Sequence, residues 1–555
     1  MNARTHLVPL AAAILAASLG SPAYAAASAP LRDLGRADAS TRVDVALVLN
    51  YRNEAQLDQL IEAQADETSP LYHHFIDQAQ FADYFAPSAA DYARVIASLG
   101  RAGFTVTQTF ANRTVVDASA PAPVAERYFN TEIHRVQQPG VGTQYVNVRP
   151  ASTPAEIAGL VTGFVGLSTI RTMHPDYAFL PAAAGHAGGQ VVKNGNPLFG
   201  PDGGYGPQIF INSYDLPAGS GTTGSGRASG VAGDADFLDS DLAGYLSYFG
   251  VTRTGPTTVR VKVDGGPPAG NGGADSVETA LDVETIVSLA PGTALYVYET
   301  KPFYNLMYFI DMYNRVVSDN FVDTLNTSYS QCETAFEPKF PKMADKIEKQ
   351  GSVLGITFHA SAGDGGVDTY GCGEKVSVGT PTDTPHNISV GGTILDVNSS
   401  TGQETSETGW NDSSGATGGG VSIVFKLPSW QKKVPNIITS GRNLPDVAFD
   451  ASPYTGESYY YNGQWQGPIG GTSLSSPIFG AALTEIDQLH GSRAGYLNTS
   501  LYKTWLKDGY GSGSTAYFRD ITSGSIPPYS AKAGYDQMSG IGAALATNLS
   551  GILPY

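Results

Sequence analysis

Basic residues are scarce in this 555-residue chain. It has 33 lysines and arginines against 51 aspartates and glutamates, which gives a formal net charge of -18. This balance speaks against nucleic acid or an anionic membrane surface as a partner. Charged residues make up only 15% of the chain, while glycine (65 residues) and tyrosine (30 residues) are abundant. The composition is typical of a loop-rich globular protein rather than a disordered one, and the chain has no internal repeat or charge run.

Long hydrophobic runs are also missing. The longest candidate, residues 7–19, is shorter than the ~20 residues that a helix needs to span a bilayer. It follows Arg4 and precedes Ala23-Tyr24-Ala25, and this order of charge, apolar run and cleavage pattern predicts a signal peptide over residues 1–25. We therefore expect a secreted protein without a membrane anchor.

Cysteine is nearly absent, since only Cys332 and Cys372 occur. An exported protein meets an oxidising compartment, which favours one disulfide between them. Two free buried thiols are the alternative.

The N-terminal part of the chain has the pattern of an α+β domain. A length of 555 residues implies more than one domain. We assign residues 31–174 to the first domain and residues 175–204, rich in Ala, Gly and Pro, to a linker that contains a processing region. The first domain has strand candidates at 43–49 and 105–116 and helix candidates at 54–65, 89–99 and 121–129.

Residues 205–555 form the second expected domain. Strand and helix candidates alternate along it, which predicts an α/β fold with a parallel sheet flanked by helices. The strand candidates are 227–233, 258–263, 294–299, 322–328 and 353–360, and the helix candidates are 239–249, 277–289, 305–317 and 341–349. The tyrosines at 459–461 are expected in a hairpin.

A candidate nucleophile lies in the octapeptide GGTSLSSP at residues 470–477. Its serine, Ser473, is surrounded by small residues that would let a substrate carbonyl approach the backbone. The apolar run 477–483 predicts a helix that begins just behind the serine. A serine hydroxyl becomes nucleophilic only when a base takes its proton. Taken alone, the octapeptide could equally be a plain turn.

Two carboxylates are spaced for one helix face. Glu278 and Asp282 are four residues apart in the segment GGADSVETALDVETI, and Asp275 is a possible N-cap of an amphipathic helix. The pair is either a solvated acidic face or a carboxyl pair with a shared function.

A third acid, Asp364, lies in SAGDGG at residues 361–366, directly after an apolar stretch. A strand followed by a glycine turn would place it at the carboxyl end of a strand, where α/β enzymes build their sites. The alternative is a turn aspartate that bonds its own backbone.

Together these motifs resemble the sedolisin (serine-carboxyl peptidase) family, relatives of the subtilisin-like proteases. A subtilisin needs a histidine in a His-Gly-Thr-His context, and none of the nine histidines here has one; His359 is expected in a buried strand. The resemblance implies a subtilisin-like fold with Glu278 as general base to Ser473. It also implies that Asp282 orients Glu278 and that Asp364, as a neutral acid, donates a hydrogen bond to the oxyanion.

The first domain carries a resemblance of its own. The segments SPLYHHF at 69–75 and FADYFAPS at 81–88 resemble the activation prodomain of kumamolisin-like precursors in the same family. This implies a zymogen whose prodomain assists folding and inhibits the enzyme. The segment 213–217 matches the beginning of the family's peptidase domain.

The C-terminal segment resembles the family's calcium site. The resemblance implies one structural Ca²⁺ held by the carboxylates of Asp520 and Asp536 and by the carbonyls of Ile521, Lys532 and Gly534. Lys532 stands where the family usually has glycine, so its carbonyl is a ligand only if lysine tolerates the backbone angles there. Aspartate-rich turns without metal are the alternative.

Acid action follows from the choice of base. At pH 4 a histidine with a pKa of ~6.5 is neutral in roughly 0.3% of molecules, whereas about one-third of glutamates with a pKa of ~4.3 are ionised. The rate profile should be bell-shaped, because Glu278 must lose a proton while Asp364 keeps one.

We therefore predict a secreted, acid-acting, monomeric serine-carboxyl endopeptidase that cleaves proteins or peptides through an acyl-enzyme on Ser473. Whether it acts as an endopeptidase or a tripeptidyl-peptidase depends on how open the cleft is. The alternatives are a conventional Ser-His-Asp subtilisin and a catalytically silent secreted binding protein of the same fold.

Overall fold

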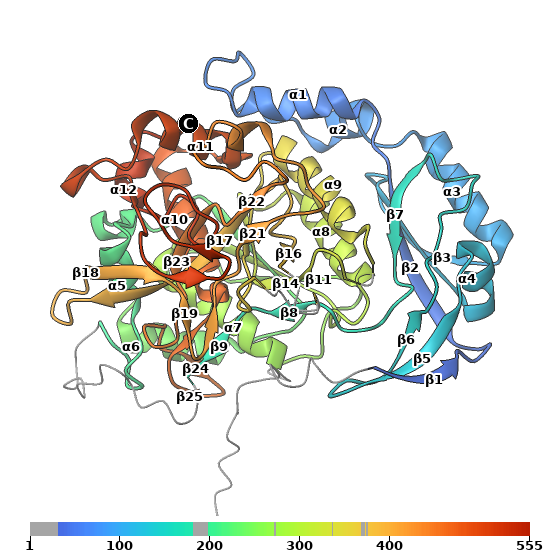
Figure 1. Ribbon diagram of the computed structural model, residues 1–555, viewed down its shortest axis with the longest axis horizontal. Coiled ribbons are helices and arrows are strands. Elements are labelled where there is room, and N and C mark those ends of the chain that lie inside the picture. Colours follow the sequence, from blue (N-terminus) through green and yellow to red (C-terminus); the bar gives the residue numbers. More distant parts are fainter. Residues whose placement is uncertain are drawn as a thin grey trace, which may run out of the picture.

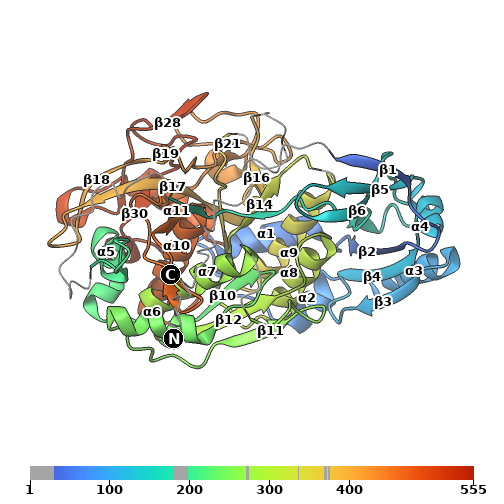
Figure 2. The same cartoon turned by 90° about the horizontal axis from the view of Figure 1, so that it is seen from below.

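The computed structural model describes residues 31–180, 198–270, 274–335, 337–367, 372 and 376–554. The expected signal peptide and residues 181–197 of the expected linker lie outside these ranges. The N-terminal domain lies at one end of the molecule, beside a larger α/β domain (Figures 1 and 2). Within the described ranges, no helix is apolar over a length that could cross a bilayer.

The N-terminal domain is built on an antiparallel sheet of four strands in the order β3-β4-β2-β7. Helices α3 and α4 cover one face of it, and a smaller sheet, β1-β5-β6, lies beside it. The strands are β1 (Arg32–Arg36), β2 (Arg42–Leu49), β3 (Thr105–Thr109), β4 (Val115–Pro121), β5 (Ile133–Gln138), β6 (Gly142–Asn147) and β7 (Val161–Val165). The helices are α1 (Glu54–Gln64), α2 (Gln78–Tyr84), α3 (Ala89–Ala102) and α4 (Ala122–Phe129).

Strand β2 is buried on both faces because its alternate side chains meet different partners. Val45 and Leu47 pack in the core that β2 shares with α3 and α4, whereas Ala46 and Val48 pack against helices of the larger domain. Helix α1 extends beyond the sheet and lies along the larger domain, next to α9 (Figure 1). The N-terminal domain is therefore joined to its neighbour through a continuous hydrophobic core.

The larger domain contains an eight-stranded sheet in the order β11-β12-β10-β13-β15-β17-β18, with β23 also pairing with β17. All pairs are parallel except β17 with β18. This confirms the expected subtilisin-like α/β class preceded by an α+β domain. The strands are β10 (Ala228–Gly233), β11 (Val259–Lys262), β12 (Ala294–Glu299), β13 (Thr324–Thr327), β15 (Thr357–Ser361), β17 (Asn387–Val397), β18 (Glu404–Gly409) and β23 (Val447–Asp450).

Helices cover both faces of this sheet. Helices α7 and α10 pack against each other on one face, and α8 and α9 lie on the other, against the N-terminal domain. The helices are α5 (Pro207–Ser213), α6 (Asp239–Phe249), α7 (Ala274–Leu289), α8 (Met307–Asp319), α9 (Phe340–Val353), α10 (Thr472–His490), α11 (Leu497–Asp508) and α12 (Ala546–Ser550).

Three sequence predictions of secondary structure are wrong in their bounds. The expected strand 105–116 is two strands, β3 and β4, separated by a turn in which Arg113 has a positive φ of 58°. The apolar stretch 353–360 begins with the end of α9, and only residues from Thr357 onward form β15. Helix α10 begins at Thr472 rather than behind Ser473.

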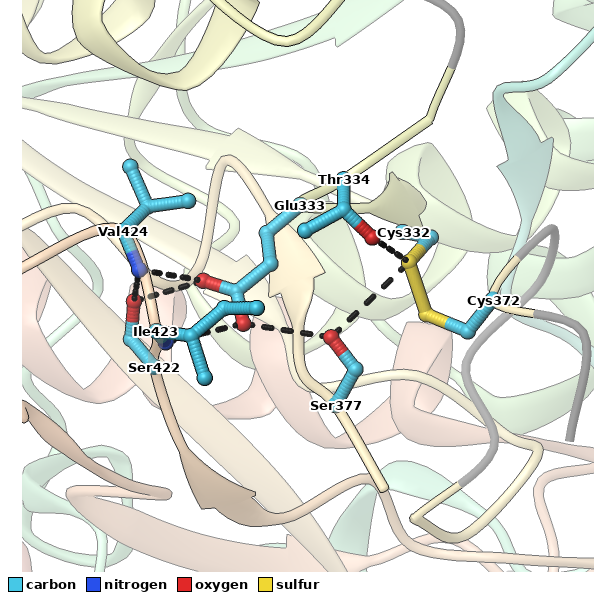
Figure 3. Close-up of a disulfide and its surroundings, with 8 residues drawn as sticks. All are labelled: Cys332, Glu333, Thr334, Cys372, Ser377, Ser422, Ile423 and Val424. Atoms are coloured by element: carbon cyan, nitrogen blue, oxygen red, sulfur yellow. Dashed lines mark hydrogen bonds between the residues drawn. A yellow bond between two sulfur atoms is a disulfide. The ribbon is translucent and has the colours of Figure 1, made fainter. Parts of the chain in front are cut away.

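The expected disulfide joins Cys332 to Cys372, which are 40 residues apart in sequence. Cys332 ends β14 (Tyr329–Cys332), and the neighbouring Glu333 accepts hydrogen bonds from Ser377 Oγ and Ser422 Oγ (Figure 3). The disulfide and this carboxylate together fix the end of β14. The expected tyrosine hairpin is also present, since β24 (Tyr460–Tyr461) pairs with β25 (Gln464–Trp465).

Candidate active site

Ser473 lies in the first turn of α10, with its side chain buried. The chain turns just before the helix at Gly471, whose φ of 98° favours glycine. Ser473 Oγ donates a hydrogen bond of 2.8 Å to Glu278 Oε2 and lies 3.3 Å from the carbonyl oxygen of Ser328. The serine hydroxyl is therefore hydrogen-bonded to a carboxyl group, the arrangement in which a base can accept its proton.

Glu278 and Asp282 are completely buried on α7. This excludes the solvated acidic face, and the helix is buried almost all round rather than amphipathic. Asp282 Oδ1 accepts a bond of 2.7 Å from Ser328 Oγ. The other two oxygens, Glu278 Oε1 and Asp282 Oδ2, have no hydrogen-bond partner in the described part of the chain. A proton shared between the two side chains would satisfy both.

Asp275 does not cap α7. The helix begins one residue earlier, at Ala274, and Asp275 forms an ion pair with Arg171 instead. This pair ties the start of α7 to the C-terminal end of the N-terminal domain.

Burial is the main cause of the raised pKa values of the carboxyl pair. It raises the pKa of Glu278 well above its ordinary value, and the negative charge of Asp282 raises it further, against the opposing bond from Ser473. The pKa of Asp282 is also raised by burial, and the hydrogen bonds from Ser328 and Asn326 oppose the rise. The pair therefore holds a proton into a higher pH range than a free carboxyl would.

Asp364 follows β15 in a turn where Gly363 has a φ of 106°. Asp364 Oδ1 accepts bonds of 2.7 Å from Thr472 N and 2.8 Å from Thr472 Oγ1. Its other oxygen, Oδ2, is buried and unpartnered among the described residues. Burial first, and then the charge of Asp176, raise the pKa of Asp364 well above its usual range. If Asp364 is neutral, this free oxygen can donate a hydrogen bond.

The structure brings Ser473, Glu278, Asp282 and Asp364 together at the carboxyl ends of the strands. The sequence motifs did not reveal a fifth participant, the segment that crosses this site. This segment, residues 174–179, is called the cleft segment below. Its first strand, β8 (His174–Pro175), pairs with β14, and its second, β9 (Ala178–Phe179), pairs with β26 (Ile469–Gly470). Asp176 lies between these two strands and contacts Ser473, whose backbone N donates a 2.9 Å hydrogen bond to the Asp176 carbonyl oxygen. Only the fold brings this segment to the serine, so residue type alone could not have identified it.

The described histidines do not bond to Ser473. His359 lies in β15, as expected, and its Nδ1 is 3.0 Å from Ser476 Oγ. Complete burial lowers the pKa of His359 to about 3. His174, in the cleft segment, has a pKa lowered to about 4 by burial and by Arg171. Both rings therefore lose their charge at a lower pH than a free histidine does.

The two aspartates of the expected calcium loop accept hydrogen bonds from backbone N–H groups of a short segment. Gly534 N donates to both carboxylate oxygens of Asp520 (3.3 and 3.1 Å), and Lys532 N donates a 2.9 Å bond to Asp536 Oδ2. The left-handed residue is Gly534, with a φ of 83°, while Lys532 does not adopt a positive φ. Ile521 lies next to Asp520 and is buried.

This donor set fits a hard cation, because carboxylate and carbonyl oxygens are the ligands that Ca²⁺ prefers. Within the described ranges there is no group of three or more His, Cys, Asp or Glu side chains that could hold a metal. A cation in this loop would therefore depend on backbone carbonyls in addition to the two aspartates.

Two family models match the chain. One, described as the Pro-kumamolisin activation domain, matches residues 30–170, and the other, described as the subtilase family, matches residues 268–512. Fold, site and matches together define a class of protein: a subtilase-type peptidase that carries an activation domain.

Full-length relatives narrow this class to one family. Sedolisin of Pseudomonas sp. (strain 101) is 30% identical over 550 residues, which cover 95% of this chain and 89% of the relative. Kumamolisin of Bacillus sp. (strain MN-32) is 28% identical over 536 residues, covering 93% and 92%. A solved structure of Pseudomonas sedolisin, a serine-carboxyl proteinase, matches with a TM-score of 0.56 and 29% identity over 63% of this chain and 97% of that one. The chain belongs to the sedolisin family.

Proposed function

We propose that this protein is a secreted, acid-acting serine-carboxyl endopeptidase, made as a zymogen, that hydrolyses peptide bonds through an acyl-enzyme on Ser473. One observation carries the proposal: Ser473 Oγ bonds at 2.8 Å to Glu278, a buried carboxyl, in the place where a conventional serine protease has histidine. This favours the carboxyl mechanism over the Ser-His-Asp alternative.

Each carboxyl group has a separate role in the proposed reaction. Glu278 accepts the proton of Ser473 Oγ as the oxygen attacks the substrate carbonyl, and then gives it to the leaving amine. Asp282, one helical turn away, shares the proton network and orients Glu278. Asp364 Oδ2 and the backbone N–H of Ser473 donate to the oxyanion. Water then hydrolyses the ester by the reverse sequence.

Acid action follows from the protonation that these roles require. Glu278 must be ionised to accept a proton, whereas Asp364 must be neutral to donate one. Both groups have raised pKa values because they are buried. The rate should therefore fall on both sides of an optimum, and burial places both limits higher than in free carboxyl groups. These limits belong to the coupled carboxyl system rather than to one residue.

The position of the cleft segment supports an endopeptidase and a zymogen. Residues 174–179 pair with β14 before Asp176 and with β26 after it, and the chain continues from residue 174 back into the N-terminal domain. A cleft that holds chain on both sides can accept an internal peptide bond. The same segment blocks access to Ser473 in the precursor, so the prodomain would act as an inhibitor until it is cleaved.

Three further parts of the proposal concern the surroundings of the site. The Asp520 and Asp536 loop, with the carbonyls of Ile521, Lys532 and Gly534, would hold one structural Ca²⁺. The protein is expected to act as a monomer on protein or peptide substrates. A silent binding protein of the same fold is the second candidate, but the complete set of buried carboxyl groups around Ser473 has no purpose in binding alone and is costly to bury.

The test uses the acid-treated precursor and a denatured protein substrate at pH 4. The wild type is compared with Ser473→Ala and Glu278→Gln. We expect cleavage by the wild type, a loss of roughly 10⁴-fold or more without the nucleophile, and a loss of about 10²- to 10⁴-fold without the base. Mass spectrometry of the rapidly quenched and digested reaction should show the acyl adduct on the peptide that contains Ser473. Full activity of either variant contradicts the mechanism, and no cleavage by the wild type favours the binding protein.

A further inference from the structure

The cleft segment is bound as a substrate would be. Asp176 N donates a 3.1 Å bond to the carbonyl of Ser328, and Asp176 O accepts a 2.9 Å bond from Ser473 N. The residues before it form an antiparallel pair with β14, and the residues after it form one with β26. An extended chain held by main-chain bonds on both sides is a general mode of peptide recognition. The carbonyl that faces the nucleophile is that of Asp176, so the bond next to Ser473 is Asp176–Tyr177.

The surroundings of this carbonyl are those needed for an oxyanion. A Cβ atom placed on Gly471 would lie 2.2 Å from Asp176 O and 2.5 Å from Asp364 Oδ2. The carbonyl and the unpartnered carboxyl oxygen therefore converge on the same point, above the first turn of α10. The glycine leaves the space that the chain of Asp176 occupies, since the same Cβ would also lie 2.6 Å from Tyr177 Cα.

The side chain of Asp176 enters a polar pocket and is completely buried. Its Oδ1 accepts a 2.9 Å bond from Ser330 Oγ, and its Oδ2 accepts a 2.7 Å bond from Ser361 Oγ. Ser330 lies on β14, and Ser361 ends β15. Each carboxyl oxygen thus has its own hydroxyl donor from a different strand, so the pocket matches a planar group with two polar atoms.

The pocket favours the neutral form of that group. Both donors are uncharged hydroxyls, and the charged groups that face the site from α7 and from the turn after β15, Glu278 and Asp364, are acids. Burial consequently raises the pKa of Asp176 to about 7, and the bonds from Ser361 and Ser330 oppose the rise. A neutral carboxamide would satisfy the same two hydroxyls, because a hydroxyl can accept as well as donate.

We propose that Ser330 and Ser361 make this peptidase selective for an aspartic acid or asparagine immediately before the scissile bond, and that its first substrate is its own Asp176–Tyr177 bond. The inference rests on the proposed function and adds the substrate class. In the first turnover, Ser473 Oγ bonds to the carbonyl carbon of Asp176 and its proton passes to Glu278. The bond from that carbon to Tyr177 N breaks, and the proton moves to this nitrogen. Water then hydrolyses the ester and leaves Asp176 as a new C-terminus.

The first experiment compares peptides that differ only before the scissile bond. Internally quenched peptides with the sequence of residues 172–181 carry aspartate, asparagine or leucine at that position, and kcat/KM is measured from pH 3 to pH 6 with acid-activated enzyme. At pH 4 the asparagine and aspartate peptides should agree within a few-fold. Leucine, which leaves both hydroxyls unpaired, should be roughly 10- to 100-fold worse. Above pH ~4 the aspartate peptide should become progressively worse relative to asparagine as its carboxyl group ionises, because burial and the neighbouring acids disfavour a charge in the pocket.

The pocket itself is tested by Ser330→Ala and Ser361→Ala. Each variant should lower kcat/KM for the asparagine peptide by about tenfold or more while leaving the leucine peptide unchanged or improved. Ser229→Ala is the matched control, because Ser229 is a buried serine near the start of β10, in the same sheet as Ser361, where it bonds Thr484. This control should leave the preference among the three peptides unchanged.

The precursor provides an independent readout. Intact mass spectrometry after a shift to pH 4 should show a first cut that leaves Tyr177 at the new N-terminus. Asp176→Asn should be cut at the same bond, and Asp176→Leu at least tenfold more slowly there. The selectivity is overturned if the leucine peptide is cleaved equally well or better, or if the first cut falls elsewhere in both wild type and Asp176→Asn. In either case, acid cleavage that still depends on Ser473 would uphold the proposed function. An intact precursor with no peptide cleaved contradicts both.

Discussion

At the scale of single residues, four carboxyl groups meet one serine. Ser473 bonds to Glu278, and the charges of Asp282, Asp176 and Asp364 all act on Glu278. Burial is the largest cause of the raised pKa in each of the four. Such a cluster is stable only where most of its members are neutral. The protonation state of the site is therefore coupled to its chemistry, and substitutions that change only a proton should be visible in the pH profile.

Asp364→Asn should extend activity to higher pH. The amide oxygen can keep both bonds from Thr472, and the amide nitrogen can take the place of Oδ2 as a permanent donor. The alkaline limb, which in the wild type reflects loss of the Asp364 proton, should move up by at least one pH unit in kcat/KM measured on a peptide without titratable side chains.

The control for this prediction is Asp364→Ala, which removes the donor and should lower kcat by roughly 10²- to 10³-fold at every pH. An alkaline limb that stays where it is in Asp364→Asn would mean that another group sets it.

Asp282→Asn should move the acidic limb in the opposite direction. The charge of Asp282 raises the pKa of Glu278, so its removal lowers that pKa and leaves the base ionised in stronger acid. We expect a lower kcat, because the shared proton is lost, and an acidic limb displaced to lower pH. Stopped assays of kcat from pH 2 to pH 6 would detect the shift, and an acidic limb displaced upward would contradict the assigned coupling.

At the scale of helices and strands, the sequence predicted those elements whose pattern is local. Helix α6 and strand β12 have the expected bounds because their flanking residues interrupt the pattern clearly. The stretch 353–360 misled because it is apolar throughout, and a buried helix end cannot be distinguished from a buried strand by hydrophobicity. The full burial of α7 was not visible from its sequence either, because Glu278 and Asp282 were also consistent with a solvated acidic face.

The disulfide at the end of β14 should stabilise the larger domain. It closes a loop of 40 residues, for which chain entropy gives an upper value of about 4 kcal/mol. The double variant Cys332→Ala/Cys372→Ala, made in the inactive Ser473→Ala precursor to prevent self-cleavage, should lose about 2–4 kcal/mol in urea unfolding. An unchanged midpoint and slope would show that Glu333 and its four donors hold β14 without the disulfide.

At the scale of the whole molecule, the residues of the candidate site were predictable from the sequence, but the segment that lies across the site was not. Motifs identified the serine and three acids because each motif is local. The cleft segment 174–179 pairs with strands about 150 and 290 residues further along the chain, so only the tertiary fold places it there. The packing of β2 between the two domains is also a tertiary feature, although its apolar run indicated burial.

The whole precursor should be more stable in acid than at neutral pH. Burial raises the pKa of Glu337 and of Glu348 to about 8, and that of Glu457 to about 7, each from 4.5. The unfolded chain loses these protons near pH 4.5 while the folded chain keeps them, so this stabilisation is complete below that pH and is lost as pH rises toward 8. Calorimetry of the Ser473→Ala precursor should show a Tm roughly 5–10 °C lower at pH 8 than at pH 4.5. A Tm that rises over this range would contradict the assignment.

The central claim is that a carboxyl group, not a histidine, is the base for Ser473. The most direct measurement is kcat/KM for a denatured protein substrate from pH 2 to pH 9, with acid-activated wild type, Glu278→Ala and Ser473→Ala. We predict a bell-shaped profile confined to acid for the wild type and no measurable cleavage by either variant. Cleavage that peaks above pH 7 and survives Glu278→Ala would show that a histidine is the base.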